Sequence, residues 1–140
     1  MSRKKTIFRM TLASTARNVG RVEKFVEKVH GHVALDEIQM HKVMVALTEA
    51  VNNAIVHGNR EKKKKKVLVI CEVLPGWLLF VVNDQGKGFN PQEIANPLRN
   101  ENLLRESGRG IFLMRTLMDR VEFEAIRGGY EVRLWLELNK

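Results

Sequence analysis

The sequence has little that would place the chain in a membrane or in an oxidising compartment. It contains one cysteine, Cys71, so no disulfide can form within the chain, and the apolar residues around it indicate a buried, unreactive thiol. No apolar run approaches the roughly 20 residues that a helix needs to cross a bilayer. The basic start, MSRKK, is not followed by the apolar segment of a secretory signal. These absences predict a cytoplasmic protein with no membrane contact.

Positive charge is what the chain has in excess. Its 140 residues carry a formal net charge of +8, yet 44% hydrophobic and 29% charged residues are typical of a globular protein, and we expect one domain over residues 1–140. Five of the 24 basic residues form the run KKKKK at 62–66, which is either a solvated turn or an anion-binding patch. Because no aromatic residue is interleaved and no nucleic-acid-binding motif occurs elsewhere, we predict no direct nucleic-acid contact.

Two amphipathic helices are predicted in the first half of the chain. The first follows a strand at residues 4–12, begins at a cap formed by Ser14 or Thr15, and ends with Gly31 as its C-terminal cap. The second begins at Asp36 and runs to about residue 57.

The second half of the chain is dominated by predicted hairpins. Apolar segments at 66–74 and 77–84 flank a Pro-Gly turn, and a closing hairpin alternates around an Arg-Gly-Gly turn at 127–129. Between the hairpins lie a long irregular segment and a third helix. The predicted fold class is therefore α/β, a two-layer sandwich with a mixed, mainly antiparallel sheet and three helices on one face.

The second helix carries an unusual polar stripe within VALTEAVNNAIVHGN, residues 45–59. At about 100° per residue, Glu49, Asn53 and His57 fall opposite the apolar face that is centred on Leu47. Helix periodicity alone would assign this stripe to solvent.

Two glycine motifs follow later in the chain. VVNDQGKGF ends a strand with Asp84 and continues through Gly86 and Gly88; the carboxylate can accept a hydrogen bond from an exocyclic amine, and the glycines allow close backbone approach. ESGRGIFLM places Gly108 and Gly110 where a helix opens, and free N–H groups there could bind an anion. Either motif alone could be a plain turn, and neither is a P-loop or a dinucleotide fingerprint.

Together the three motifs resemble the N, G1 and G2 boxes of the Bergerat-type ATP-binding fold of histidine kinase-like (GHKL) ATPases. The segment between the last two boxes resembles the ATP lid of that fold, at about residues 91–108. ALTEAVNNAIVHGN and GRGIFLMRTLMD are most similar to the anti-sigma factor serine/threonine kinases of bacterial partner-switching systems. The resemblance covers about residues 5–138.

The resemblance implies a role for each matching residue. It implies that Asn53 ligates Mg²⁺, that Asp84 accepts a hydrogen bond from the adenine amino group, and that Glu49 orients or deprotonates the nucleophile. Glu49 could instead be a structural carboxylate on the metal side. The remaining implied ATP contacts are Gly86, Gly88, Gly108, Arg109 and Gly110.

The implied function is that of an anti-sigma regulatory factor. It would be a homodimeric serine/threonine protein kinase that uses ATP and Mg²⁺ to phosphorylate an anti-anti-sigma antagonist protein and that sequesters a sigma factor. The alternative is a non-catalytic ATP-binding module whose nucleotide state controls partner docking. The presence of Glu49 with Asn53 favours the kinase, and the basic side of the first helix, with Arg17, Arg21 and Lys24, is a candidate partner surface.

Overall fold

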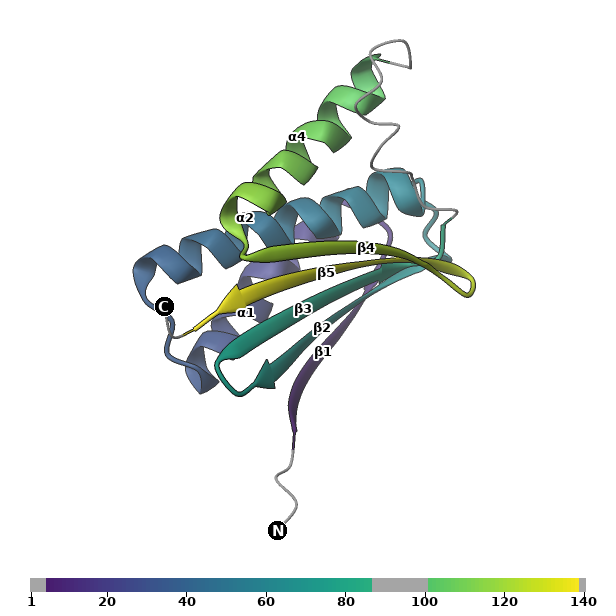
Figure 1. The fold of residues 1–140 in the computed structure, drawn as a ribbon. Coiled ribbons are helices and arrows are strands. Elements are labelled where there is room, and N and C mark those ends of the chain that lie inside the picture. The colour runs from purple at the N-terminus through teal and green to yellow at the C-terminus, as the bar shows by residue number, and fades with distance from the viewer. Residues whose placement is uncertain (1–4, 87–100, 139–140) are drawn as a thin grey trace.

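The chain folds into an antiparallel sheet with helices on one face (Figure 1). The computed structural model describes residues 5–86 and 101–138, with the backbone alone for 101–107. The strands are β1 (Thr6–Ala13), β2 (Lys66–Leu74), β3 (Trp77–Asp84), β4 (Arg120–Ile126) and β5 (Gly129–Glu137). They lie in the order β1-β2-β3-β5-β4, and all four pairings are antiparallel. The predicted two-layer α/β sandwich is confirmed, and these strands contain none of the parallel pairs that a mixed sheet would have.

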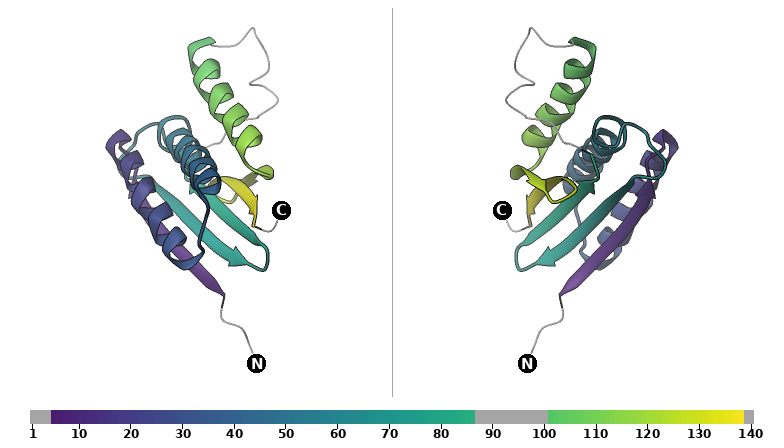
Figure 2. Two further views of the ribbon diagram at one scale, coloured as in Figure 1. Left: turned by 90° about the vertical axis from the view of Figure 1, so that its left-hand side faces the viewer. Right: turned by 90° about the vertical axis from the view of Figure 1, so that its right-hand side faces the viewer.

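The helices lie on the same side of the sheet (Figure 2). They are α1 (Arg21–His32), α2 (Glu37–Asn53) and α4 (Glu101–Leu117); a 3₁₀ turn, η1 (Ala16–Gly20), precedes α1 and a π-helical turn, η2 (Ala54–Gly58), continues α2. Helix α4 packs against α2, and Figure 1 shows its N-terminal end rising away from the sheet. No helix within the described ranges combines the length and the apolar character needed to cross a membrane.

The two predicted helix starts have different outcomes. Asp36 caps α2 as predicted: its carboxylate accepts from the Gln39 N–H at 2.7 Å, and the Gln39 side chain accepts from the Asp36 N–H at 3.1 Å. At the first helix Thr15 stands at the N-cap of the 3₁₀ turn, one of the two predicted positions, but its side chain makes no capping bond, and the Ser14 hydroxyl donates to the Lys65 carbonyl at 2.6 Å. Ser14 therefore joins two distant segments.

The end of α1 also differs from the prediction. Gly31 lies inside the helix, which continues to His32, and the Val33 N–H closes the last turn on the Val29 carbonyl at 2.8 Å. Val33 leaves the helix in an extended conformation (φ −121°), so no left-handed glycine is needed.

The hydrophobic core lies between the sheet and the helices. Side chains alternate along β5, so that Val132 and Leu134 face the core while Arg133 and Trp135 face the other way. Cys71 is fully buried in this core, and burial together with the nearby Glu72 charge raises its pKa to about 12. The thiol therefore stays protonated, as expected of an unreactive cysteine.

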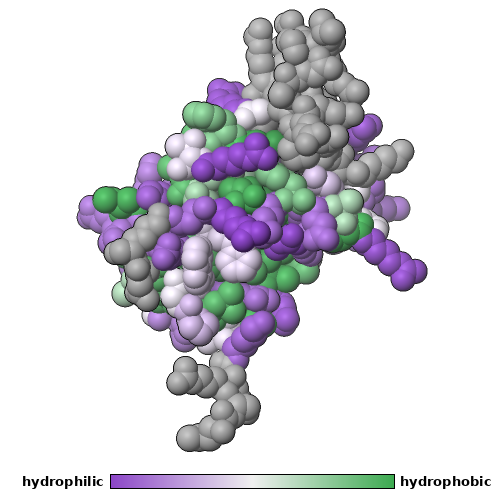
Figure 3. Space-filling model, in the orientation of Figure 1, coloured by the Kyte–Doolittle hydropathy of each residue, from purple (hydrophilic) through white to green (hydrophobic). Residues whose placement is uncertain are grey.

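None of the described helices covers the outer face of the sheet, which mixes apolar and charged groups (Figure 3). Arg133 forms ion pairs there with Glu122, Glu124 and Glu131. Beside them the rings of Trp77 and Trp135 meet edge to face, with centroids 6.1 Å apart. Both tryptophans of the chain therefore lie on this face.

Candidate functional site

The polar stripe of α2 lies under α4 instead of in solvent. Gly110 of α4 is so close to α2 that a Cβ on it would stand 3.0 Å from Glu49 Oε2 and 3.1 Å from Asn53 Nδ2. Glu49 is half-buried and Asn53 is only 4% exposed. Three residues predicted for the site thus come together from two helices that are far apart in sequence.

Asn53 has the properties of a residue that receives a ligand. Its Nδ2 atom is buried and has no hydrogen-bond partner among the described residues, and leaving such a group unsatisfied costs about 1–3 kcal/mol. Rotation of the amide exchanges nitrogen and oxygen, so the same position can present an oxygen to a cation. The missing Cβ of Gly110 keeps the space in front of it open.

Asp84 ends β3 as a buried carboxylate, 7% exposed. Its Oδ1 atom accepts from the Gly86 N–H at 2.8 Å. Burial raises the pKa of Asp84, and the Gly86 hydrogen bond and the Lys65 charge offset only part of that rise. The side chain is a hydrogen-bond acceptor in a poorly hydrated setting, where it can select a ligand that donates.

The end of η2 and the turn after Asp84 pack without a side chain between them. A Cβ on Gly58 would overlap the Asp84 carboxylate, and a Cβ on Gly86 would overlap the Gly58 carbonyl. The sequence predicted only that the second helix ends near residue 57, so the contact of Gly58 with Asp84 was missed. Helix-end signals are local, and nothing in the sequence around Gly58 indicates which distant residue it touches.

Comparison with known proteins identifies the family. Residues 12–136 match the model of the histidine kinase-like ATPase domain. The chain belongs to this family. The resemblance found in the sequence is thereby confirmed.

Curated relatives carry the name serine-protein kinase RsbW. One from Staphylococcus aureus is 27% identical over 128 residues, covering 86% of this chain and 80% of the relative. One from Staphylococcus epidermidis is 29% identical over 119 residues, covering 80% of this chain and 75% of the relative.

Two solved structures share the histidine kinase-like ATPase fold. The RsbU and RsbW domains of a Mycobacterium tuberculosis protein superpose with a TM-score of 0.69 at 18% identity, covering 95% of this chain and 32% of that one. The histidine kinase domain of a blue-light activated kinase from Erythrobacter litoralis gives 0.57 at 17% identity, covering 87% and 60%. This chain thus spans about a third of the first structure's chain and three fifths of the second's.

The third motif of this family member lies differently from its prediction. Gly108, Arg109 and Gly110 were expected to open a helix, but α4 begins at Glu101, and the predicted lid at 91–108 therefore ends in a helix. The preceding ENLLRE segment consists mostly of good helix formers, which can carry the helix through two glycines despite about 1 kcal/mol for each. In this arrangement Gly110 serves close helix packing, while Arg109 is exposed.

The remaining predicted residues are placed only in part. Gly88 and lid residues 91–100 lie outside the described residues. His57 lies half-buried in η2. The roles of the site residues stay predictions, because no ligand tests them.

The lysine run at 62–66 forms the connection from η2 to β2. Arg60 and Glu61 adopt left-handed conformations (φ 52° and 57°), and Lys65 closes a turn on the Lys62 carbonyl at 2.9 Å. Most of the lysine side chains are exposed. The run is therefore an ordered turn with exposed charges, a placement that fits both interpretations of the sequence.

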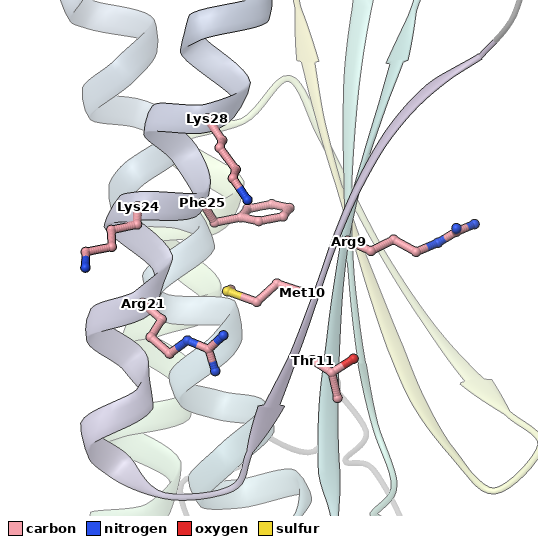
Figure 4. A pocket seen from close by; sticks show the side chains of 7 residues that line it. All are labelled: Arg9, Met10, Thr11, Arg21, Lys24, Phe25 and Lys28. Carbon is pink, nitrogen blue, oxygen red and sulfur yellow. The ribbon is translucent and has the colours of Figure 1, made fainter.

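A second hollow, separate from the site, lies between β1 and α1 and has a volume of about 610 Å³. Figure 4 shows Arg21 and Lys28 turned from α1 toward β1, with Met10 and Phe25 between them. None of the residues predicted for nucleotide binding lines it. The complete lining is Arg9, Met10, Thr11, Arg21, Lys24, Phe25 and Lys28.

Proposed function

We propose that this chain is an ATP-binding anti-sigma regulatory factor that acts as a serine/threonine protein kinase. It would phosphorylate an anti-anti-sigma antagonist protein and sequester a sigma factor. The observation that carries the proposal is the convergence of Glu49, Asn53 and Gly110 where α4 crosses α2. The relatives named serine-protein kinase RsbW support it.

The residues present fit a magnesium–nucleotide complex. Bound ATP would supply the phosphoryl group, and Mg²⁺ would neutralise charge on the phosphate oxygens. Asn53 would hold the metal through its side-chain oxygen, placed by rotation of the amide where the buried Nδ2 atom now has no partner among the described residues. Asp84 would accept from the adenine amino group, and Gly86, which packs against the Gly58 carbonyl and donates to Asp84 Oδ1, would hold the turn beside the base.

Glu49 is the candidate catalytic residue. It lies one helical turn before Asn53 on α2 and beside the same glycine of α4. From there its carboxylate would orient a serine or threonine hydroxyl of the antagonist and accept its proton as the hydroxyl takes the γ-phosphoryl group of ATP, with ADP as the leaving group. Gly108 and Arg109 would reach the phosphates only if the first turns of α4 rearranged.

For the partners, we propose the basic hollow between β1 and α1 as the docking surface. Its cations would attract acidic side chains, and Met10 and Phe25 supply an apolar floor. We further propose a homodimer in the cytoplasm, a single domain over residues 1–140, and no direct nucleic-acid contact.

Phosphate transfer tests the kinase directly. The chain is incubated with [γ-³²P]ATP, Mg²⁺ and an anti-anti-sigma antagonist protein, and label on the antagonist is measured. We expect Glu49→Ala to lower the transfer rate by about 100-fold or more, the range of general-base catalysis, with ATP affinity nearly unchanged. Glu37→Ala, at an exposed position on the same helix, is the matched control and should transfer normally.

The outcomes separate the two functions. Transfer that survives Glu49→Ala removes Glu49 from the chemistry. ATP binding by the wild type without any transfer supports the alternative, a regulatory module whose nucleotide state controls docking. Absence of ATP binding contradicts both.

A further inference from the structure

A fully buried amide beside the site has no part in the proposed chemistry. Asn59 follows η2 directly and is 0% exposed. Its Nδ2 donates to Ser14 Oγ at 2.8 Å and to the Lys66 carbonyl at 3.0 Å, while its Oδ1 accepts from the Gln85 N–H at 2.7 Å. Asparagine is usually exposed in proteins, so a buried one with its donors and acceptor used indicates a specific task.

These bonds join three segments at one end of the sheet. Ser14 follows β1, Lys66 begins β2 and Gln85 follows β3. Two further bonds close the network: Ser14 donates to the Lys65 carbonyl at 2.6 Å, and the Lys66 N–H donates to the Gln85 side chain at 2.5 Å. The Asn59–Ser14 bond is buried and the Lys66–Gln85 bond is exposed, so the network is best protected from water around Asn59.

The network ends next to Asp84. Gln85 is the residue that follows Asp84, and the Asn59 N–H also closes η2 on the Ala54 carbonyl at 2.8 Å. Asn59 therefore fixes both sides of the contact between Gly58 and the Asp84 carboxylate. That contact leaves no room for a Cβ, so a small displacement of either side would change where the carboxylate stands.

We propose that Asn59 is a positioning residue for base recognition, which holds the Asp84 carboxylate at the depth where it accepts a hydrogen bond from an exocyclic amine. The inference rests on the proposed nucleotide binding and deepens it, because it assigns the adenine preference to Asn59 acting through Gln85. The acceptor half of the amide carries this role, since Oδ1 holds the Gln85 N–H. The donor half ties the network to β1 and β2.

The location of Asn59 predicts which part of a nucleotide it affects. Glu49 and Asn53 lie on α2, before the π turn. Asn59 follows that turn, and the Asp84 carboxylate lies against its last residue, Gly58. Loss of the Gln85 bond should therefore weaken recognition of the base and leave recognition of the phosphates. A purely structural role would instead lower the affinity for every nucleotide alike, or lower the melting temperature alone.

The test compares ADP with inosine diphosphate, in which a carbonyl oxygen replaces the exocyclic amine. Binding of each to the full chain with Mg²⁺ is measured by calorimetry at a temperature where every variant is folded by circular dichroism. We expect Asn59→Ala to reduce the preference for ADP by about tenfold, the lower end of what a hydrogen bond to a charged group contributes, because the acceptor is displaced and not removed. Its affinity for inosine diphosphate should stay within about threefold of the wild type.

Two further variants separate positioning from stability. Asn59→Asp keeps the acceptor for the Gln85 N–H but loses both donors, so it should be less stable than the wild type and still prefer ADP more than Asn59→Ala does. Ser14→Ala removes other bonds of the same network and should keep the preference. If Asn59→Ala fails to fold, Asn59→Asp decides: a lost preference overturns the inference and a retained one supports it.

Failure of the inference and failure of the proposed function look different. An unchanged ADP preference in Asn59→Ala, or an equal loss of both affinities, overturns the positioning role while wild-type ADP binding stands. A wild type that binds neither nucleotide overturns the proposed function, and the inference with it.

Discussion

Asp84 stands in a setting that is unfavourable for a charge in the ligand-free protein. Its carboxylate is buried and its pKa is raised, chiefly by desolvation. A donor from a ligand would stabilise the ionised form. The ionised Asp84 therefore lowers the stability of the ligand-free fold, and its proposed task is to select the base.

Replacing this carboxylate should have opposite effects on stability and on binding. We expect Asp84→Asn to raise the melting temperature of the ligand-free chain, because a buried charge is removed while an oxygen remains to accept from Gly86. ATP affinity should fall by roughly 10- to 100-fold, the worth of a hydrogen bond to a charged acceptor. Thermal melting and calorimetry measure the two effects.

The pH dependence of both effects follows from the sign of the shift. Because the pKa of Asp84 is higher in the folded than in the unfolded chain, the folded chain binds more protons as pH falls between the two values. The stabilisation by Asp84→Asn should therefore be largest at neutral pH and fade as pH falls through the raised pKa. Wild-type ATP affinity should fall over the same range.

The control for these measurements is Asp36→Asn at the exposed cap of α2, since asparagine caps as well as aspartate. It should change neither ATP affinity nor its pH dependence. Stability of Asp84→Asn below that of the wild type at neutral pH would contradict the argument.

At the scale of elements, the sequence predicted features that depend on neighbouring residues but not contacts between distant segments. The capping box of Asp36 and the hairpin turn at Gly76 (φ 75°) depend on residues within a few positions, and both were predicted. The cover that α4 places over Asn53 depends on a helix more than forty residues later in the sequence. The bonds of Asn59 to Ser14 and Gln85 span 45 and 26 residues. Periodicity contains no information on such pairs.

The start of α4 was predicted wrongly because two glycines were taken as a boundary. They lie within a helix whose earlier residues favour it, so the N–H groups at 108–110 are in the helix interior and not at its first turn. Phosphate binding there would require α4 to begin later in the nucleotide-bound chain. Glycine is the residue that makes such a change least costly.

A glycine-to-alanine pair tests this requirement. Gly108→Ala should stabilise the helical state by about 1 kcal/mol and weaken ATP binding by up to about fivefold, because unwinding then costs more. Calorimetry and helix content by circular dichroism with and without ATP are the measurements.

Gly31→Ala is the matched control, since Gly31 lies inside α1 with open space around its missing Cβ. It should stabilise the chain without changing ATP affinity. Tighter ATP binding by Gly108→Ala would show that the helix stays intact in the complex.

At the scale of the whole molecule, two separate features each gather several basic side chains. One is the ordered turn at 62–66 and the other is the hollow between β1 and α1. Composition revealed the excess charge and the lysine run, but not the hollow. The hollow depends on how β1 and α1 pack in space, which composition does not show. A single domain over 1–140 stays a prediction.

Charge reversal distinguishes the two features. We expect the double variant Arg21→Glu, Lys28→Glu to weaken binding of a partner protein that docks at the hollow at least tenfold, because cations that face β1 become anions. Lys63→Glu with Lys64→Glu changes the net charge equally at exposed positions of the turn. Both pairs should leave ATP affinity unchanged, as neither contributes to the site.

Partner affinity and its salt dependence, measured by surface plasmon resonance, decide the matter. Equal losses in the two double variants would mean that only the overall field attracts the partner, and the hollow would lose its assigned role. A greater loss in the lysine-turn variant would move the docking surface there.

The paired tryptophans on the outer face have a practical consequence. Trp77 begins β3 and Asp84 ends it, so the indole lies about 23 Å along the strand from the carboxylate. Tryptophan emission from this chain therefore reports on whatever approaches the outer side of the sheet, such as a second subunit. It is nearly blind to the base of a bound nucleotide, so a labelled nucleotide or heat of binding must supply that signal.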